Sequence, residues 1–482
     1  MNLSLLIIIP TIFSLLLLFV NGLKQVRTVS LIAALLQFAM SIYLIVKYFA
    51  ERAVNKAPFL FEQHYEWFKT PNINYHVGVD GVSVAMIALT AFVILAGVLV
   101  SWKMEKLNKE FFFLLLFLSI GAYGFFISLD LFTMFFFLEV AVIPKFILIG
   151  IWGSGRKEYS AMKLILMLMA GSALIFVGLA GLYFNTSGNG SFDMLKIASD
   201  NISPELQRLF FPFVFIGFGI FTALFPFHTW VPDGHSSAPT AASMFLAGIS
   251  MKLGGYGCLR AATYMMPEGA AFYSDAIIIL ACIGILYGAF ATMMQTDLKY
   301  INAYSSVSHN GFVLLGIGLL TKTAITGAVL QMISHGLMTA LFFAVIGMIY
   351  DRTHTREVAK MSGLLKITPF ISSAFVIVGL VSLGLPGFSG FVAEMTVFMG
   401  GWQKGNMFYY VATIAACASI VVTAVYILRV IGSVIMGPLK VNGNEQVVYA
   451  DATWYEKSSI VLLMAGILVV GILPFAVLRL IS

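Results

Sequence analysis

Residues 227–239 of the chain, FHTWVPDGHSSAP, decide how the sequence folds. They place two histidines, an aspartate and two prolines between two apolar runs, FFPFVFIGFGIFTALFP (210–226) and TAASMFLAGISMKLGGYGCL (240–259). Proline removes a backbone donor and ends or kinks a helix, so we expect one apolar helix before this segment and another after it. The second run also carries Lys252 near its centre, where apolar surroundings make a charge expensive.

The composition indicates a membrane protein. Of the 482 residues, 60% are hydrophobic and 10% are charged, whereas a soluble domain carries about 25% charged residues. The net charge of +6 is small for this length and gives no reason to expect nucleic acid as a partner. Cys258, Cys282 and Cys417 lie in apolar runs without CxxC spacing, which indicates packing rather than disulfides or zinc or iron–sulfur ligation.

The apolar runs predict an all-α polytopic protein with a single membrane domain over residues 1–482. A transmembrane helix needs about 20 apolar residues. On that basis the sequence contains about fourteen transmembrane helices, near residues 3–22, 28–49, 79–101, 111–128, 131–151, 162–184, 209–227, 240–262, 272–294, 301–319, 325–350, 367–400, 407–436 and 457–478. The first run lacks a basic region and a cleavage motif, so we expect a retained helix rather than a signal peptide.

Lysine and arginine are unevenly distributed between the predicted loops. They are more frequent in the short loops after odd-numbered helices, such as Lys103, Lys106 and Lys109 after helix three. Short loops rich in these residues remain in the cytoplasm. The distribution therefore predicts that the odd loops are cytoplasmic and that both termini lie on the outer side of the membrane.

Two predicted helices are interrupted. Helix twelve, 367–400, would be about 50 Å long, whereas the hydrocarbon core is about 30 Å thick, and Gly384-Leu385-Pro386-Gly387 lies at its middle. Helix seven ends in the opening segment. Breaks five helices apart are typical of two inverted five-helix repeats. We expect one repeat in helices 4–8 (111–262), a second in helices 9–13 (272–436), and a C-terminal helix over 457–482.

Five ionisable residues stand out because they lie deep within predicted spans. They are Glu139 in helix five, Lys252 in helix eight, His309 in helix ten, His335 in helix eleven and Glu394 in helix twelve. Each such residue is costly in a membrane, so several together indicate function. Burial disfavours the charged forms of acids and bases alike, which allows protons to pass between them. We interpret the set as a lateral chain of protonatable groups; structural ion pairs are the alternative.

Several motifs between about Tyr75 and Gly400 identify a resemblance. They are NYHVGVDGVS, FFFLEVAVIP, HTWVPDGHSSAPTAASMFLAGISMKLGGYG, QTDLKYINAYSSVSHNGF, MISHGLMTALFF and GLPGFSGFVAE. Together they resemble the antiporter-like subunit family of the proton-pumping NADH:quinone oxidoreductase, respiratory complex I. The string HTWVPDGH is typical of its subunit M (chain 4) members rather than of the two sister subunits.

The resemblance implies roles for the buried ionisable residues. Glu139 corresponds to the family's helix-five glutamate, Lys252 to its central helix-eight lysine, and Glu394 to the helix-twelve residue that opens towards the outer face. His309 and His335 are similar to the histidines of the hydrated axis that joins them.

Three further residues acquire expected roles from the same comparison. His228 and His235 flank the break at helix seven, where freed backbone and polar side chains could hold water for proton entry. Lys299 resembles a family lysine near the cytoplasmic entry, and a positive-inside anchor is an equal alternative.

The sequence departs from the family pattern at one position. The family usually carries a lysine nine residues before the tryptophan of HTW, paired with the helix-five glutamate, but this chain has Phe221 there. Lys145 stands instead six residues after Glu139. Six residues separate the two by about 9 Å along the helix and place them on different faces. Lys145 is therefore either a substitute cation in a shared cavity or an interfacial lysine that snorkels towards the cytoplasm.

The expected function is that of a proton-translocating subunit of a translocase, located in the bacterial inner membrane, without a redox centre or cofactor of its own. Flavin and iron–sulfur clusters are expected in partner subunits. The expected partners are the other membrane-arm subunits, including two antiporter-like sisters, and the lipid bilayer. A subunit of a multi-subunit cation/proton antiporter and a non-pumping structural spacer are the alternatives.

Overall fold

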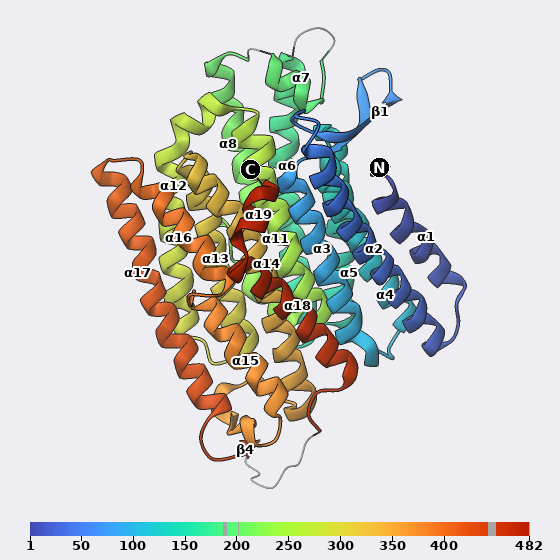
Figure 1. Cartoon of the computed structure of the whole chain (residues 1–482), viewed down its shortest axis with the longest axis vertical. Coiled ribbons are helices and arrows are strands. Elements are labelled where there is room, and N and C mark those ends of the chain that lie inside the picture. Colours follow the sequence, from blue (N-terminus) through green and yellow to red (C-terminus); the bar gives the residue numbers. More distant parts are fainter. Residues whose placement is uncertain (187–189, 201, 442–449, 482) are drawn as a thin grey trace.

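The computed structural model describes residues 1–186, 190–200, 202–441 and 450–481. The chain forms a bundle of long helices that run roughly along one direction, with helix α1 at one edge of the view and helix α17 at the other (Figure 1). Within the described residues, ten helices are long and apolar enough to cross a membrane. The prediction of a helical, multi-pass membrane protein is thus confirmed.

The N-terminal half follows the predicted order of helices. Its helices are α1 (Leu5–Phe19), α2 (Leu23–Arg52), α3 (Gly81–Val100), α4 (Asn108–Ile127), α5 (Leu131–Trp152), α6 (Lys157–Asn185), α7 (Met194–Ser199) and α8 (Pro204–Thr222). The short helix α7 lies in the connection between the predicted spans 162–184 and 209–227. Its first turn is capped by Asp193, whose side chain accepts hydrogen bonds from two backbone N–H groups.

The C-terminal half begins after the opening segment. Its helices are α9 (Trp230–Ser237), α10 (Thr240–Phe245), α11 (Met251–Gly257), α12 (Pro267–Met293), α13 (Leu298–Gly318), α14 (Lys322–Thr353), α15 (Pro369–Ser382), α16 (Ser389–Trp402), α17 (Met407–Val430), α18 (Trp454–Ile472) and α19 (Pro474–Ile481). The predicted C-terminal helix is divided into α18 and α19 because Pro474 cannot continue α18. Its last residue, 482, lies outside the described residues.

In the part of the chain that the structure describes, two pairs of strands lie outside the helices, and the prediction of an all-α chain omitted them. Strand β1 (Leu60–Phe68) pairs in antiparallel fashion with β2 (Ile73–Val79), and the two-residue strands β3 (Met361–Ser362) and β4 (Lys440–Val441) form a second pair. Strand β1 and helix α7 lie at one end of the bundle, and β4 lies at the opposite end (Figure 1). The strands therefore cover the ends of the bundle and leave its interior helical.

The first predicted break is present. Helix α8 ends at Thr222, before the predicted end at residue 227, and Ala223 has the left-handed φ of 71°. The indole Nε1 of the buried Trp230 donates a hydrogen bond to the carbonyl of Ile220 at 2.9 Å. Trp230 thereby adds a second hydrogen bond to a carbonyl in the last turn of α8, which also accepts one from the N–H of Ala223.

The helix segment that carries Lys252 is irregular on both sides of the lysine. A wide π-helical turn at Leu246–Ser250 joins α10 to α11, and a second one at Cys258–Tyr264 continues α11. Such a turn disrupts the regular backbone pairing and often occurs at functional sites. The carbonyl of Ala247 in the first wide turn accepts a hydrogen bond from Lys252 Nζ at 2.7 Å.

The second predicted break separates α15 from α16. Gly384 and Gly387 have φ values of 72° and 96°, a backbone region that favours glycine. Helix α18 packs directly against this break, because a Cβ on Gly471 would lie 2.4 Å from the carbonyl oxygen of Gly387. The close approach of α18 needs glycine at position 471.

Candidate functional site

Lys252 and His335 form the first contact of the buried site. Lys252 lies on α11 with 0% of its surface exposed, and His335 is buried on α14. The Nζ atom of Lys252 is 2.8 Å from Nδ1 of His335. With the carbonyl of Ala247, the lysine thus has two hydrogen-bond acceptors in the interior. An ammonium in this position can donate to an unprotonated ring nitrogen.

His335 faces a second histidine, His309 on α13. Their ring centroids are 5.3 Å apart and the rings are inclined by 28°, so the two rings are stacked rather than hydrogen-bonded. Nδ1 of His309 lies 3.4 Å from Oε1 of Glu394 on α16, which is 4% exposed. The structure therefore brings together four of the predicted residues in the order Lys252, His335, His309 and Glu394, which we call the central chain.

Glu394 lies against the second break. A Cβ on Gly384 would be 2.8 Å from Oε2 of Glu394, so the backbone of the break and the carboxylate are in close contact. The end of the central chain thus coincides with the place where the helix is interrupted. That arrangement positions a proton-accepting group beside polar backbone.

Glu139 lies apart from the central chain. It is half-buried on α5, and its carboxylate accepts a hydrogen bond from the buried Ser172 of α6. Phe221, where the resemblance led us to expect a lysine, is buried on α8. Its ring packs on the residue next to Ser172, since a Cβ on Gly171 would lie 3.3 Å from Phe221 Cε2. An apolar ring therefore packs against α6 one residue before the hydrogen-bond partner of Glu139.

Lys145 is buried inside this chain. It is 1% exposed, and its Nζ has no hydrogen-bond partner among the residues that the structure describes. Glu139 is close enough to interact with it electrostatically. The ammonium does not reach the surface of the chain, which favours the cavity interpretation of Lys145 over snorkelling.

The opening segment forms a second polar group of residues. His235 on α9 is buried between the rings of Trp230 and Phe343, with centroid distances of 6.0 and 5.6 Å. Lys299, at the start of α13, is buried and donates a hydrogen bond from Nζ to the carbonyl of Ala238 at 2.7 Å. His235 lies within electrostatic range of both Lys299 and Lys252, but neither of its ring nitrogens has a hydrogen-bond partner among the described residues.

His228 and Asp233 are also in the opening segment. The ring of His228 stacks on Phe225 and meets Tyr287 of α12 at 4.8 Å between centroids. Asp233 accepts a hydrogen bond from Lys163 Nζ of α6 at 2.7 Å. His228 thus has aromatic neighbours, and its Nδ1 has no hydrogen-bond partner in the described part of the chain.

Several polar residues that sequence reasoning missed complete the surroundings of His309. Gln331 Nε2 lies 3.3 Å from His309 Nδ1, and Ser382 Oγ lies 3.2 Å from His309 Nε2. Neutral polar residues are common on buried helix faces, so their type alone gives no signal. The spacing does give a signal for Gln331, because it precedes His335 by four residues and therefore lies on the same face of α14.

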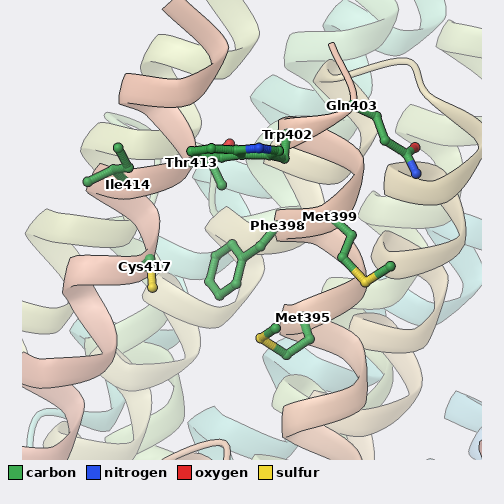
Figure 2. Close-up of a pocket in the computed structure, with 8 residues that line it drawn as sticks. All are labelled: Met395, Phe398, Met399, Trp402, Gln403, Thr413, Ile414 and Cys417. Atoms are coloured by element: carbon green, nitrogen blue, oxygen red, sulfur yellow. The ribbon is translucent and has the colours of Figure 1, made fainter. Parts of the chain in front are cut away.

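An apolar groove of about 520 Å³ lies between α16 and α17. Figure 2 shows the side chains that line it: Met395, Phe398, Met399, Trp402, Gln403, Thr413, Ile414 and Cys417. The groove contains none of the residues of the central chain. Elsewhere in the described residues, no group of three histidine, cysteine or acidic side chains is arranged to hold a metal ion.

Sequence comparison identifies the family. The model of the NADH:quinone oxidoreductase/Mrp antiporter transmembrane family matches residues 128–419. This chain belongs to that family. Subunit M of the NADH-quinone oxidoreductase of Rickettsia bellii is 33% identical over 95% of this chain and 91% of its own length. Chain 4 3 of the NAD(P)H-quinone oxidoreductase of Picosynechococcus is 36% identical over 85% of this chain and 74% of its own.

Solved structures share the fold of the family. A chain of respiratory complex I from Thermus thermophilus matches with a TM-score of 0.88 at 23% identity, over the full length of both chains. A chain of the Mrp complex from Dietzia matches with a TM-score of 0.87 at 18% identity, over 99% of this chain and 95% of its own. At these identities the matches establish the fold alone, and the fold is common to both kinds of complex.

Proposed function

We propose that this chain is the antiporter-like, proton-translocating subunit of the membrane arm of an NADH:quinone oxidoreductase. The observation that carries the proposal is the central chain, in which a buried lysine, two histidines and a glutamate from four helix segments follow one another through the interior. Buried ionisable groups are costly in a membrane, and a connected row of them is a reason to expect proton movement.

The geometry suggests how a proton moves. Lys252 gives a proton to Nδ1 of His335 across 2.8 Å. The stacked rings of His335 and His309 share no hydrogen bond, so transfer between them requires a ring rotation or a water molecule. His309 then passes a proton from Nδ1 to Glu394, which lies against the break between α15 and α16. We assign Glu394 to the outlet on the outer face.

The opening segment supplies the inlet in this proposal. Lys299 and His235 form a route from the start of α13 towards Lys252, and His228 lines the same break. The architecture is that of two inverted five-helix repeats, over residues 111–262 and 272–436, each with one interrupted helix. The loops after odd-numbered helices are cytoplasmic, and both termini lie on the outer side of the bacterial inner membrane.

Glu139 takes part with an altered partner. Because Phe221 removes the usual cation, we assign that role to Lys145, which is buried on the same helix within electrostatic range. The remaining reactions belong to other subunits: flavin and iron–sulfur clusters oxidise NADH and reduce quinone there, and two antiporter-like sisters pack beside this chain in the membrane arm.

The main alternative is a subunit of a multi-subunit cation/proton antiporter. The structural match to the Mrp complex supports a shared fold. However, relatives that are 33–36% identical over most of the chain are named as subunit M or chain 4 of quinone oxidoreductases, which favours the oxidoreductase. A structural spacer would gain nothing from burying Lys252 and Glu394, since uncompensated buried charge destabilises a protein.

Substitution of the central chain tests the proposal. In membrane vesicles from the native organism, Lys252→Met and Glu394→Gln should each reduce NADH-driven proton uptake at least tenfold (about 1.4 kcal/mol), with the assembled complex still present. Lys366→Met and Glu357→Gln make the same chemical changes at exposed sites and should leave uptake unchanged. Normal uptake by both assembled central-chain variants would refute the proposal.

A further inference from the structure

The two ring nitrogens of His309 are contacted by side chains from three other helices. Nε2 lies 3.2 Å from the hydroxyl of Ser382 on α15. Nδ1 lies 3.3 Å from Nε2 of Gln331 on α14 and 3.4 Å from Oε1 of Glu394 on α16. All of these residues are buried. One nitrogen of the ring therefore has two partners.

Those two partners of Nδ1 make opposite demands. The amide nitrogen of Gln331 only donates, so it requires an Nδ1 without a proton. An ionised Glu394 only accepts, so it requires an Nδ1 that carries one. The two contacts belong to different protonation states of His309, and the same proton distinguishes them.

The side chain of Gln331 can satisfy either state. A half-turn of its amide exchanges the donor nitrogen for the acceptor oxygen Oε1. Oε1 is buried and has no hydrogen-bond partner among the described residues, so the half-turn breaks no contact at that atom. The amide can thus follow the protonation of His309 without a movement of the helices.

We propose that Gln331 is a positioning residue that acts as a valve between His309 and Glu394. This inference rests on the proposed function. With its oxygen towards the ring, Gln331 supports a protonated Nδ1. When that proton bonds to the Glu394 carboxylate, the N–H bond of the ring breaks and the amide turns. Its nitrogen then donates to the bare Nδ1, which hinders the return of the proton.

The proton balance closes through His335. A proton that His335 passes to His309 replaces the one that leaves Nδ1 for Glu394, while Nε2 keeps its own proton and donates it to the Ser382 hydroxyl. Once Nδ1 carries a proton again, the amide of Gln331 turns back to its starting orientation. The other titratable groups that face the ring are His335, stacked at 5.3 Å, and through it Lys252.

Two variants of Gln331 test the valve in the assembled complex. Gln331→Met keeps the length of the side chain but makes no hydrogen bond, and should lower proton uptake per NADH oxidised by about fivefold, as expected for one lost hydrogen bond. Gln331→Glu offers acceptors only and should move the pH optimum of uptake upward by about one unit, since the protonated ring is favoured. Gln403→Met, at an exposed glutamine, is the control.

The outcomes separate this inference from the proposed function. If Glu394→Gln pumps normally, both fail. If Glu394→Gln stops uptake while both Gln331 variants match the unmodified complex in proton ratio and pH profile, the valve alone is refuted. The valve is also refuted if Gln331→Met lowers proton uptake but Gln331→Glu leaves the pH profile of uptake unshifted, because lost packing would then explain the lower uptake. If Gln331→Met does not assemble, the profile of Gln331→Glu decides.

Discussion

The first prediction tests the proposal that Lys145 supplies the cation for Glu139. The change is Lys145→Met, which keeps the length of the side chain and removes its charge. Lys145 and Glu139 are six residues apart on α5, or about 9 Å along its axis. At an effective dielectric constant of about 20, two unit charges at that distance interact by about 1.8 kcal/mol.

That energy sets the size of the effect. About 1.8 kcal/mol is about a twentyfold change in the equilibrium between the charged pair and its neutral form. If Lys145 is the cation that Glu139 uses, proton uptake driven by NADH in inverted vesicles should fall by up to about twentyfold in Lys145→Met. Lys157→Met, at the partly exposed start of α6, is the matched control and should pump normally.

A second substitution decides whether charge is the cause. Phe221 packs against Gly171, which precedes Ser172, the hydrogen-bond partner of Glu139, so we expect a lysine at position 221 to reach the carboxylate. Phe221→Lys in the Lys145→Met background should restore part of the uptake. A silent Lys145→Met, or a defect that Phe221→Lys leaves unchanged, would refute the assignment of Lys145 as the substitute.

Two further predictions concern stability. Glu456→Ala should destabilise the chain by about 3–5 kcal/mol, because it leaves the buried Arg352 without the carboxylate to which two of its nitrogens donate hydrogen bonds. Thermal denaturation of the purified complex measures this, and an unchanged stability would contradict the prediction. Burial alone would lower the pKa of His76, but the carboxylates of Asp193 and Glu62 outweigh burial, and the pKa of His76 is raised. Burial alone would raise the pKa of Asp193, but its hydrogen bonds outweigh burial, and the pKa of Asp193 is lowered. The β1–β2 hairpin should therefore resist proteolysis best between pH 3.8 and 6.5, with protection lost as pH falls through the lowered pKa of Asp193 or rises through the raised pKa of His76; His76→Gln should abolish the alkaline loss, and an unchanged profile would refute the link.

The order of helices was readable from the sequence because a membrane imposes a strong local requirement. Each span needs about 20 apolar residues regardless of its neighbours, so the runs appear one after another along the chain. Both breaks were predicted for the same reason, since proline and glycine act on the backbone locally. Helix ends and the β1–β2 hairpin were less accessible, because they depend on packing at the ends of the bundle.

The residues of the central chain were also visible. Lys252 and Glu394 stand out because a charge inside an apolar run has few structural explanations. Gln331 and Ser382 gave no such signal, since a neutral polar side chain costs far less to bury when it is hydrogen-bonded. Their importance follows from which atoms of His309 they face, and that is fixed only when α13, α14 and α15 pack together.

The sequence by itself therefore determined that this protein is a multi-pass helical membrane protein with buried ionisable residues, because hydropathy, helix breakers and buried charge act locally along the chain. The tertiary structure alone decided the order of these residues, the burial of Lys145, and the sharing of one His309 nitrogen between Gln331 and Glu394. These features depend on distances of a few ångströms between side chains from different helices, and spacing within one helix does not contain them.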